Sequence, residues 1–234
     1  MNDLNELYNM LVLPFADRFD GGEVVLVLEG SMFMVPFSAL QDVEGKHFSE
    51  KCSLRIIPSF TTLKLITDSA PDYHSQGGAL IVGDPGVSRV RGLGRLPSAR
   101  QEAKEIAQLL NVLPLLGEQA TKEEVLRRIT DVCLVHIAAH GDAERGEIAC
   151  APNPCAPNSS PEVLRKEDFM LTMEDIAKVG IRAKLVVLSC CHSGCGKIMK
   201  AEGVVGIARA FIASGARSVL VSLWLLNEIG RAHV

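Results

Sequence analysis

The sequence predicts an α/β domain with a mostly parallel sheet flanked by helices. Short runs rich in Val, Ile and Leu alternate along the chain with segments whose apolar residues recur at helical spacing. Most of these runs are apolar almost throughout, as in strands buried on both faces, and several end in a glycine turn. Strands and helices that alternate in this way favour parallel pairing through right-handed crossovers.

The first part of the chain predicts a helix, a strand and a strand followed by a helix. Residues 1–15 carry acidic side chains and apolar residues at helical spacing, which is typical of an amphipathic helix and not of a signal peptide. Residues 22–30, "GEVVLVLEG", predict a central strand buried on both faces. Residues 53–66 predict a strand that ends at Pro58 and a helix after it.

The middle of the chain predicts a strand and two helices. Residues 77–86, "GGALIVGDPG", form the strand. Residues 98–112 predict a helix with Ser98 as its N-cap. Its apolar face contains Ala103, Ile106, Ala107 and Leu110. A second helix over 121–129 begins with Thr121, and Glu124 three residues later completes a capping-box pattern.

The last part of the chain predicts three strands separated by helices. The strands cover 131–141, 183–191 and 217–226, and the helices cover 171–180 and 203–216. Residues 142–170 contain "APNPCAPNSSPE", which is rich in Pro, Asn and Ser, and predict a surface loop with no rigid structure. Such a loop is either a processing or substrate-facing segment or a tolerated insertion.

A histidine and a cysteine stand at the ends of two predicted strands. "LVHIAAH" ends in His140 before Gly141, and "LVVLSCC" ends in Cys191 before His192. Functional groups of parallel sheets gather at the carboxyl ends of the strands, so the two side chains can come within hydrogen-bond distance. An imidazole that accepts the thiol proton favours the thiolate, which is the nucleophile. The backbone N–H groups of Gly141 and Cys191 can then face a developing oxyanion.

The neighbouring histidines and cysteines have structural interpretations. Cys190 is expected to pack in the core, and strand alternation then turns Cys191 away from it. His136, four residues before His140, is expected to be a structural histidine. His192 is interpreted as a polar turn residue and Cys195 as a loop thiol.

The motifs "HIAAHG" and "LSCCHSGCG", followed by "EGVVGIARAFIASGARSVLVSLW", closely resemble the CHAT domain, a caspase-like clan CD cysteine peptidase family often attached to tetratricopeptide repeats. The resemblance extends over "VLEGSMFMVPFSAL" and "LGRLPSARQEAKEIAQLL". It implies a caspase-like fold with a non-catalytic N-terminal half (1–116), a catalytic half (117–227) and a dyad of His140 and Cys191. The histidine lies about 50 residues before the cysteine, as it does in caspases.

The resemblance also bears on the substrate. "SCCHSG" resembles the metacaspase nucleophile turn, where the residue two before the cysteine is typically an aspartate that pairs with a basic substrate side chain. Ser189 occupies that position here, so it is the expected substrate-binding residue and carries no charge. A buried basic side chain without a carboxylate is strongly disfavoured. We therefore expect a preference for an apolar or small side chain. An acidic preference is disfavoured too, because no arginine lies near either motif unless Arg145, Arg165 or Arg182 folds back.

Composition excludes several other classes of function. The 24 Lys and Arg against 28 Asp and Glu give a net charge of −4, which argues against nucleic acid as a partner. The apolar runs are too short to span a membrane. The seven cysteines are interpreted as reduced thiols of a cytoplasmic protein. No cofactor is expected, because "CHSGCGKI" lacks the glycine and the hydroxyl residue of a phosphate loop and the cysteines lack the spacing of a zinc site.

The sequence leaves two functions open. One is a cysteine endopeptidase that acts on protein or peptide substrates and is activated by a partner or by tetratricopeptide repeats upstream. The other is a catalytically silent scaffold that keeps the dyad residues. Residues 228–234, "EIGRAHV", resemble the translation of a sequencing adaptor and are expected to be non-native, so the chain is expected to be a truncated fragment.

Overall fold

The computed structural model describes residues 3–70, 72–88, 90, 92–142, 144–153, 164–190, 197–199 and 203–222. They form two compact units. The first unit consists of the chain up to Asp68 together with residues 198–204, and the second begins at Ser69. The predicted boundary between a non-catalytic and a catalytic half, at residues 116 and 117, falls inside the second unit and stays a prediction about chemistry.

The first unit contains short helices and a small parallel sheet. Its elements are α1 (Asp3–Leu11), β1 (Glu23–Val27), α2 (Phe48–Lys51), β2 (Ser53–Ile57) and α3 (Phe60–Thr67), with 3₁₀ helices at Leu13–Arg18, Gly30–Met34 and Phe37–Ala39. The prediction that residues 22–30 form a central strand is wrong. Strand β1 pairs only with β2 in a two-stranded sheet, and its residues are half-buried or exposed. The apolar run is covered on one side by the first unit's own core, which includes Tyr8, Phe37 and Phe48.

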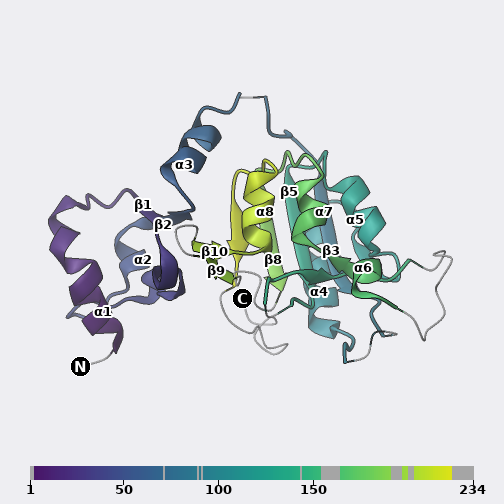
Figure 1. Cartoon of the computed structure of the whole chain (residues 1–234), viewed down its shortest axis with the longest axis horizontal. Helices are drawn as coiled ribbons and strands as arrows, with labels where there is room; N and C mark the ends of the chain where they lie inside the picture. Colours follow the sequence, from purple (N-terminus) through teal and green to yellow (C-terminus); the bar gives the residue numbers. More distant parts are fainter. Residues whose placement is uncertain are drawn as a thin grey trace. The chain divides into compact units, whose positions relative to one another are not determined.

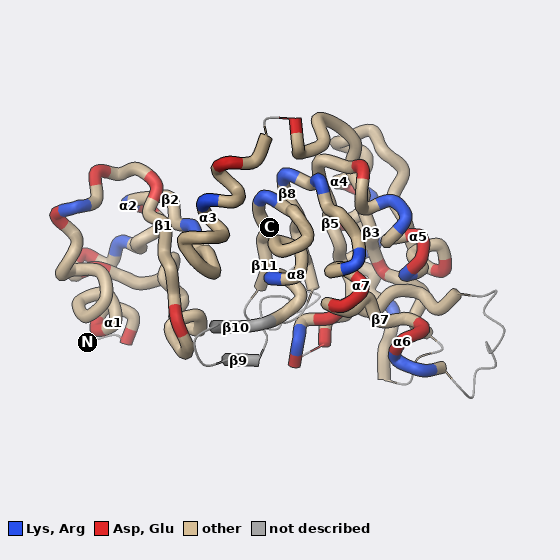
Figure 2. The backbone as a smooth tube through the Cα atoms, turned by 45° about the horizontal axis from the view of Figure 1, so that its top comes forward, with Lys and Arg blue, Asp and Glu red and all other residues tan. Residues whose placement is uncertain are grey.

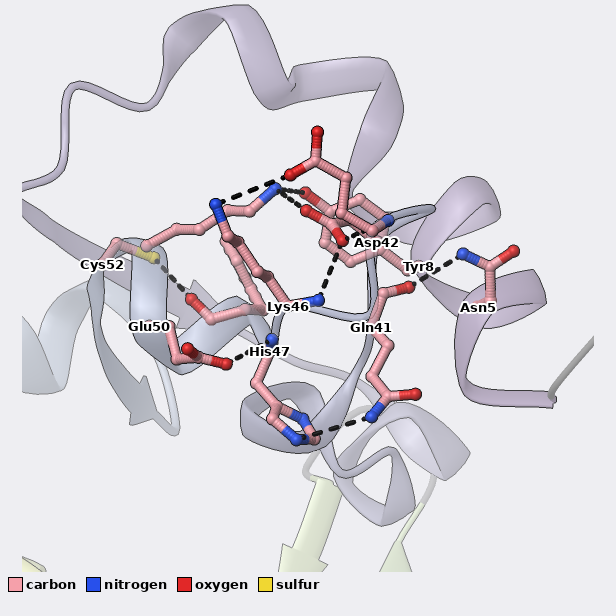
Figure 3. Close-up of polar contacts among 11 residues, drawn as sticks. Asn5, Tyr8, Gln41, Asp42, Lys46, His47, Glu50 and Cys52 are labelled. Carbon is pink, nitrogen blue, oxygen red and sulfur yellow. Dashed lines mark hydrogen bonds and ion pairs between the residues drawn. The ribbon is translucent and has the colours of Figure 1, made fainter.

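Polar contacts hold the turn between Gln41 and His47 in the first unit (Figure 3). The Lys51 ammonium lies 2.6 Å from the Asp42 carboxylate and donates a 3.1 Å hydrogen bond to the Tyr8 hydroxyl. The hydrogen bond from Lys51 lowers the pKa of the Asp42 carboxyl group. The Glu50 carboxylate accepts the backbone N–H of His47 at 2.8 Å. These contacts tie the turn to α1 and α2.

The second unit is built on a five-stranded parallel sheet in the order β11-β8-β5-β3-β4 (Figure 1). The strands are β3 (Ala79–Pro85), β4 (Leu115–Gly117), β5 (Leu134–Ala139), β8 (Leu185–Cys190) and β11 (Val219–Val221). The parallel sheet predicted from the apolar runs is confirmed. Since every pairing is parallel, the carboxyl ends of the strands lie along one edge.

Helices cover both faces of this sheet. They are α4 (Pro97–Leu109), α5 (Lys122–Arg128), α7 (Met173–Ala177) and α8 (Ile207–Ala213), and a further short helix, α6 (Lys166–Phe169), precedes α7. On one face, Ile81 of β3 packs against Ala103 and Ala107 of α4. On the other face, the alternate residues of the strands join the main core with side chains from three helices: Val125, Ile176 and Phe211. Alternation of side chains therefore divides β3, β4 and β5 between α4 on one face and the group of α5, α7 and α8 on the other.

The helix starts follow the predicted pattern in one case and differ in the other. Thr121 caps α5 as predicted, because its hydroxyl accepts the backbone N–H of Glu124 at 3.3 Å. The prediction of Ser98 as the N-cap of α4 is wrong, since the helix begins at Pro97 with Leu96 as its N-cap. Proline is favoured at the first helical position, and the backbone N–H of Leu96 donates to the Asp84 carboxylate instead of to a local side chain.

The prediction that residues 142–170 form a surface loop with no rigid structure is wrong for the part that the structure describes. Residues 148–149 form β6 (Ile148–Ala149), which pairs antiparallel with β7 (Met170–Leu171), and these residues are buried. Gly141 forms a bridge with Ile148. The proline-rich segment 154–163 lies outside the described residues. The polar composition of 142–170 as a whole hides "GEIAC" (146–150), a short apolar run whose Ile148, Ala149 and Cys150 are buried.

Two short strands precede α8. They are β9 (Lys197–Met199) and β10 (Gly203–Val205), which pair in a separate two-stranded sheet. The helix predicted over 203–216 therefore begins only at Ile207. Acidic and basic residues are interspersed along the backbone of both units (Figure 2). Among the described residues, none of the helices combines the length and apolarity that a bilayer crossing requires.

Candidate active site

Strands β5 and β8 end next to each other at the carboxyl edge of the sheet. Their parallel register pairs Ala138 with Ser189 and Ala139 with Cys190. His140 follows β5 directly, and Cys191, the predicted nucleophile, follows β8. Cys191, His192 and Cys195 lie outside the described residues. The structure therefore places the histidine of the predicted dyad and the strand that leads to the cysteine.

Two contacts fix His140. Its ring Nε2 lies 2.8 Å from the backbone oxygen of Gly94, 46 positions earlier in the chain. Its own backbone oxygen accepts the N–H of Ala149 in β6 at 2.9 Å. A carbonyl oxygen only accepts hydrogen bonds, so Nε2 must carry the hydrogen and Nδ1 of the neutral ring keeps its lone pair. The ring is thereby held in the tautomer whose Nδ1 can accept a proton.

Gly141 forms a non-hydrogen-bonded pair with Ile148. The flanking bonds run from Ala149 N–H to the His140 oxygen and from Asp142 N–H to the Glu147 oxygen. Within the described ranges, the Gly141 N–H itself donates no backbone hydrogen bond. Its amide is therefore a donor directly beside the histidine, at the position predicted to face an oxyanion.

The residues before Cys191 lie in β8. Cys190 is fully buried, and its Sγ donates a weak hydrogen bond to the Ile137 oxygen at 3.3 Å, in the core shared with α5, α7 and α8. This agrees with the packing role expected for it. Ser189 is half-buried and belongs to the alternate set of strand residues.

His136 lies away from the edge, between the sheet and α4. Its side chain is buried, and its Nε2 is 2.9 Å from the Glu102 carboxylate of α4. His136 lies three residues before the end of β5, on the face of the strand that packs against α4. The structural role expected for it fits this placement.

Asp84 was not singled out in the sequence. It is only 1% exposed, lies at the end of β3 and has a φ of 46°, which is uncommon outside glycine. Its carboxylate accepts hydrogen bonds from the Leu96 N–H at 2.7 Å and from the Arg100 Nε at 2.8 Å, and it contacts Arg95. Burial alone would raise the pKa of Asp84, but these donors outweigh it and the pKa is lowered. The signal in the sequence was an aspartate after a buried strand, in "IVGDPG".

A cavity of about 460 Å³ opens at the ends of β3 and β4. Arg95, Arg100 and Glu118 contribute to its lining, and Arg95 and Arg100 share Asp84 as their partner. Two guanidinium groups and two carboxylates thus meet there with no excess of either charge. Arg95 directly follows Gly94, so it is the arginine next to the His140 contact, whereas sequence reasoning considered Arg145, Arg165 and Arg182.

The described thiols other than Cys133 are buried. Cys52, Cys150 and Cys190 are 6% exposed or less. Burial raises the pKa of Cys52, and it raises the pKa of Cys150 to about 12. The raised pKa keeps Cys52 and Cys150 protonated near neutral pH, and burial makes all three thiols poorly accessible.

Comparison with known proteins agrees with this architecture. The CHAT domain model matches residues 2–232. Tetratricopeptide repeat protein 28 of Homo sapiens and of Mus musculus are each 31% identical over 94% of this chain, and the chain spans 11% of their length. The separase–securin complex of Saccharomyces cerevisiae contains a chain with a TM-score of 0.54 at 16% identity, over 87% of this chain and 12% of that one.

These similarities confirm the caspase-like α/β fold expected from the sequence. The family match covers nearly every residue, and the separase-complex likeness supports the same sheet with helices on both faces. The chain therefore belongs to the CHAT domain family.

Proposed function

We propose that this chain is the peptidase domain of a cytosolic caspase-like cysteine endopeptidase, with Cys191 as the nucleophile and His140 as the base. The observation that carries the proposal is the His140 ring. The Gly94 oxygen holds its Nε2–H at the carboxyl end of β5, which leaves Nδ1 able to accept a proton next to the end of β8.

The proposed reaction is acyl transfer in two steps. His140 accepts the thiol proton, and the thiolate sulfur attacks the carbonyl carbon of the scissile peptide bond. The oxyanion that forms is stabilised by the backbone N–H groups of Gly141 and Cys191. The imidazolium donates its proton to the leaving amine as the C–N bond breaks. Water then attacks the thioester while His140 accepts its proton, and the acid product and the thiol are released.

The proposed substrate is a peptide whose side chain before the scissile bond is apolar or small. Ser189 supplies no charge for a basic side chain. Arg95 and Arg100, which line the cavity at the ends of β3 and β4, are both paired with Asp84, so neither is an uncompensated cation for an acidic side chain. Both observations support a neutral preference.

Regulation is proposed to come from outside this chain. The chain spans only 11% of the tetratricopeptide repeat protein 28 sequences, whose name refers to such repeats. We propose that such repeats, or a partner that binds them, set the active arrangement around Cys191 by ordering the loops.

The proposal is tested with a peptide electrophile that reacts with thiols. We expect wild-type protein to be labelled at Cys191 and expect labelling to drop by at least about 100-fold in Cys191→Ala and in His140→Ala, in line with the usual contribution of a general base. Cys133→Ala is the matched control, because Cys133 is the thiol among the described residues that is not buried. Labelling that survives in both variants, or that never appears, would favour the silent scaffold instead.

A further inference from the structure

Asp84 differs from the other described carboxylates because both the burial of its charge and its backbone conformation cost free energy. The side chain is 1% exposed, which removes the carboxylate from water, and the φ of 46° places a non-glycine residue in the left-handed region. Such a conformation persists only where the surroundings enforce it, and it concentrates at functional sites. What the carboxylate holds should therefore indicate its role.

The carboxylate holds one short segment of chain from two sides. Its Oδ1 accepts the Leu96 N–H at 2.7 Å, and its Oδ2 lies 3.1 Å from the Nε of Arg95. Oδ2 also accepts the Nε of Arg100, one turn into α4, at 2.8 Å. Two consecutive residues and the first turn of the helix are thus attached to one buried anion.

The segment held in this way ends at the carbonyl that contacts His140. Gly94 directly precedes Arg95, and its oxygen lies 2.8 Å from His140 Nε2. Residues 93–96 have no regular secondary structure, and Gly94 has open space around it. Among the described residues, the contacts next to Gly94 along the chain are those of Asp84 with Arg95 and Leu96 on one side and the Leu93 N–H, which donates to the Val90 oxygen at 3.2 Å, on the other. Of these, only the contacts of Asp84 involve a buried charge.

We propose that Asp84 is a positioning residue for His140, which fixes the Gly94 oxygen and thereby the tautomer and orientation of the ring. This inference rests on the proposed function only for the role of His140 as a base. Arg95 and Arg100 act with Asp84 as one unit, because removing either the anion or a guanidinium releases the segment. The competing explanation is that Asp84 merely stabilises the start of α4.

The test compares Asp84→Asn and Arg95→Gln with Glu102→Gln in the 234-residue chain. Asp84→Asn keeps an oxygen for the Leu96 N–H but loses the charge that holds both arginines. Glu102→Gln is the matched control, since it removes the charge of a carboxylate on the same helix, whose partner His136 lies on the same strand as His140. The primary readout is ¹⁵N NMR of the imidazole rings, with the His140 signals assigned by their loss in His140→Gln.

In wild type we expect the His140 ring to be in the Nε2–H tautomer when neutral. In Asp84→Asn and Arg95→Gln we expect a mixture of tautomers and about a tenfold slower alkylation of Cys191, a fraction of the full contribution of a general base. Glu102→Gln should keep the wild-type tautomer even where it lowers stability. Arg95 carries the test if Asp84→Asn does not fold, because its side chain is 59% exposed and tolerates replacement.

Two results would overturn the inference. One is an unchanged tautomer in both variants together with lower thermal stability, which would make Asp84 a structural support of α4. The other is the same tautomer mixture in Glu102→Gln. If the tautomer shifts as expected while Cys191 of wild type is no more reactive than a free thiol, the positioning role stands and the proposed peptidase function fails.

Discussion

At the scale of single residues, the arrangement around His140 separates one cysteine from the others. Cys150 and Cys190 pack in the main core and Cys52 in the first unit, where burial raises the pKa of Cys52 and Cys150. Cys133 is half-buried, and its Sγ donates to the Gly78 oxygen at the opposite end of β5 from His140. Within the part of the chain that the structure describes, His140 follows β5, the strand that pairs with the one leading to Cys191.

We expect Cys191 to be alkylated faster than the six other thiols at neutral pH, because an adjacent imidazole increases its thiolate fraction. Iodoacetamide labelling across pH, read by mass spectrometry for each peptide, measures the ranking. In His140→Ala, Cys191 should fall to the rate of Cys133. Faster labelling of Cys190 or Cys195 than of Cys191 would show that the nucleophile is assigned wrongly.

A second residue-scale prediction concerns Ser189. An activated form should cleave after apolar or small residues, and Ser189→Asp should gain cleavage after Arg or Lys, because the new carboxylate can pair with a basic side chain. A peptide-library profile of both proteins measures this, with Ser189→Asn as the uncharged control. If the wild-type protein cleaved mainly after Arg or Lys, the inference from Ser189 to an apolar or small side chain would be wrong.

The sequence predicted His140 but not the groups that hold it. A histidine after an apolar run is visible in one stretch of sequence, and the family resemblance identifies its partner. The Gly94 oxygen is a backbone atom 46 positions away, and no side-chain pattern marks a carbonyl. Asp84 looked like a turn residue in "GDPG", because its partners Arg95 and Arg100 reach it only after the chain has folded back.

At the scale of elements, α4 lies unusually close to β3. A Cβ added at Gly83 would lie 2.3 Å from the Ala103 Cβ and 2.8 Å from the Ala99 oxygen. The small residues along this face of α4 therefore serve close approach, with Ala99, Ala103 and Ala107 fully buried. The periodic pattern of apolar residues predicted the helix. It did not predict the close approach of α4 to β3, because that depends on the missing side chain of Gly83.

We expect Gly83→Ala to lower the free energy of unfolding by roughly 1–3 kcal/mol or more, because the helix must move away from the strand. Gly180→Ala is the control, since a Cβ there meets no atom within 4 Å. Urea unfolding followed by circular dichroism compares the two. Equal midpoints would show that α4 can shift at no cost.

The predicted strands were more accurate than the predicted connections between them. Strands β3, β5, β8 and β11 were expected, because buried parallel strands are apolar throughout. Residues 22–30 are just as apolar but form β1 in a two-stranded sheet, where they are half-buried or exposed, because an apolar run does not specify how many strands lie beside it. Strand β6 has only two residues, which is too short for a periodic signal.

At the scale of the whole molecule, folding lowers the pKa of a histidine and of several carboxyl groups in the second unit. His74 is 6% exposed, and burial is the main cause of its lowered pKa, with Arg182, Lys184 and Arg217 adding to it. The pKa values of Asp84 and Asp175 are also lowered, because their hydrogen bonds and ion pairs outweigh burial, which would raise them.

These shifts predict a loss of stability in two stages on acidification. The unfolded chain binds a proton at His74 more readily than the native chain does. Protonation of His74 therefore leaves the free energy of unfolding unchanged above about pH 6.5 and lowers it below that pH. The carboxylates contribute stability above about pH 3.8, which is lost as the pH falls through their lower native values. Urea unfolding at a series of pH values measures both stages.

His74→Gln should remove the first stage and leave the second. Tyr73→Phe is the control. The ring centroids of Tyr73 and His74 lie 5.0 Å apart, so this variant removes a hydroxyl group next to His74 but keeps the imidazole. A slope below pH 6.5 that is equal in wild type and His74→Gln would contradict the assignment.

The parallel order of the sheet also governs when the proposed active site comes into existence. Ala79 of β3 pairs with Leu134 of β5, and Leu134 pairs with Leu185 of β8, so each pairing joins distant parts of the chain. Contacts of this kind form slowly, because a long loop must close first. During synthesis β5 leaves the ribosome well before β8, and the strand that leads to Cys191 is the last of the two to arrive. On the proposed function, the nascent chain therefore carries an ordinary thiol, and it becomes a nucleophile only when the sheet has closed around His140.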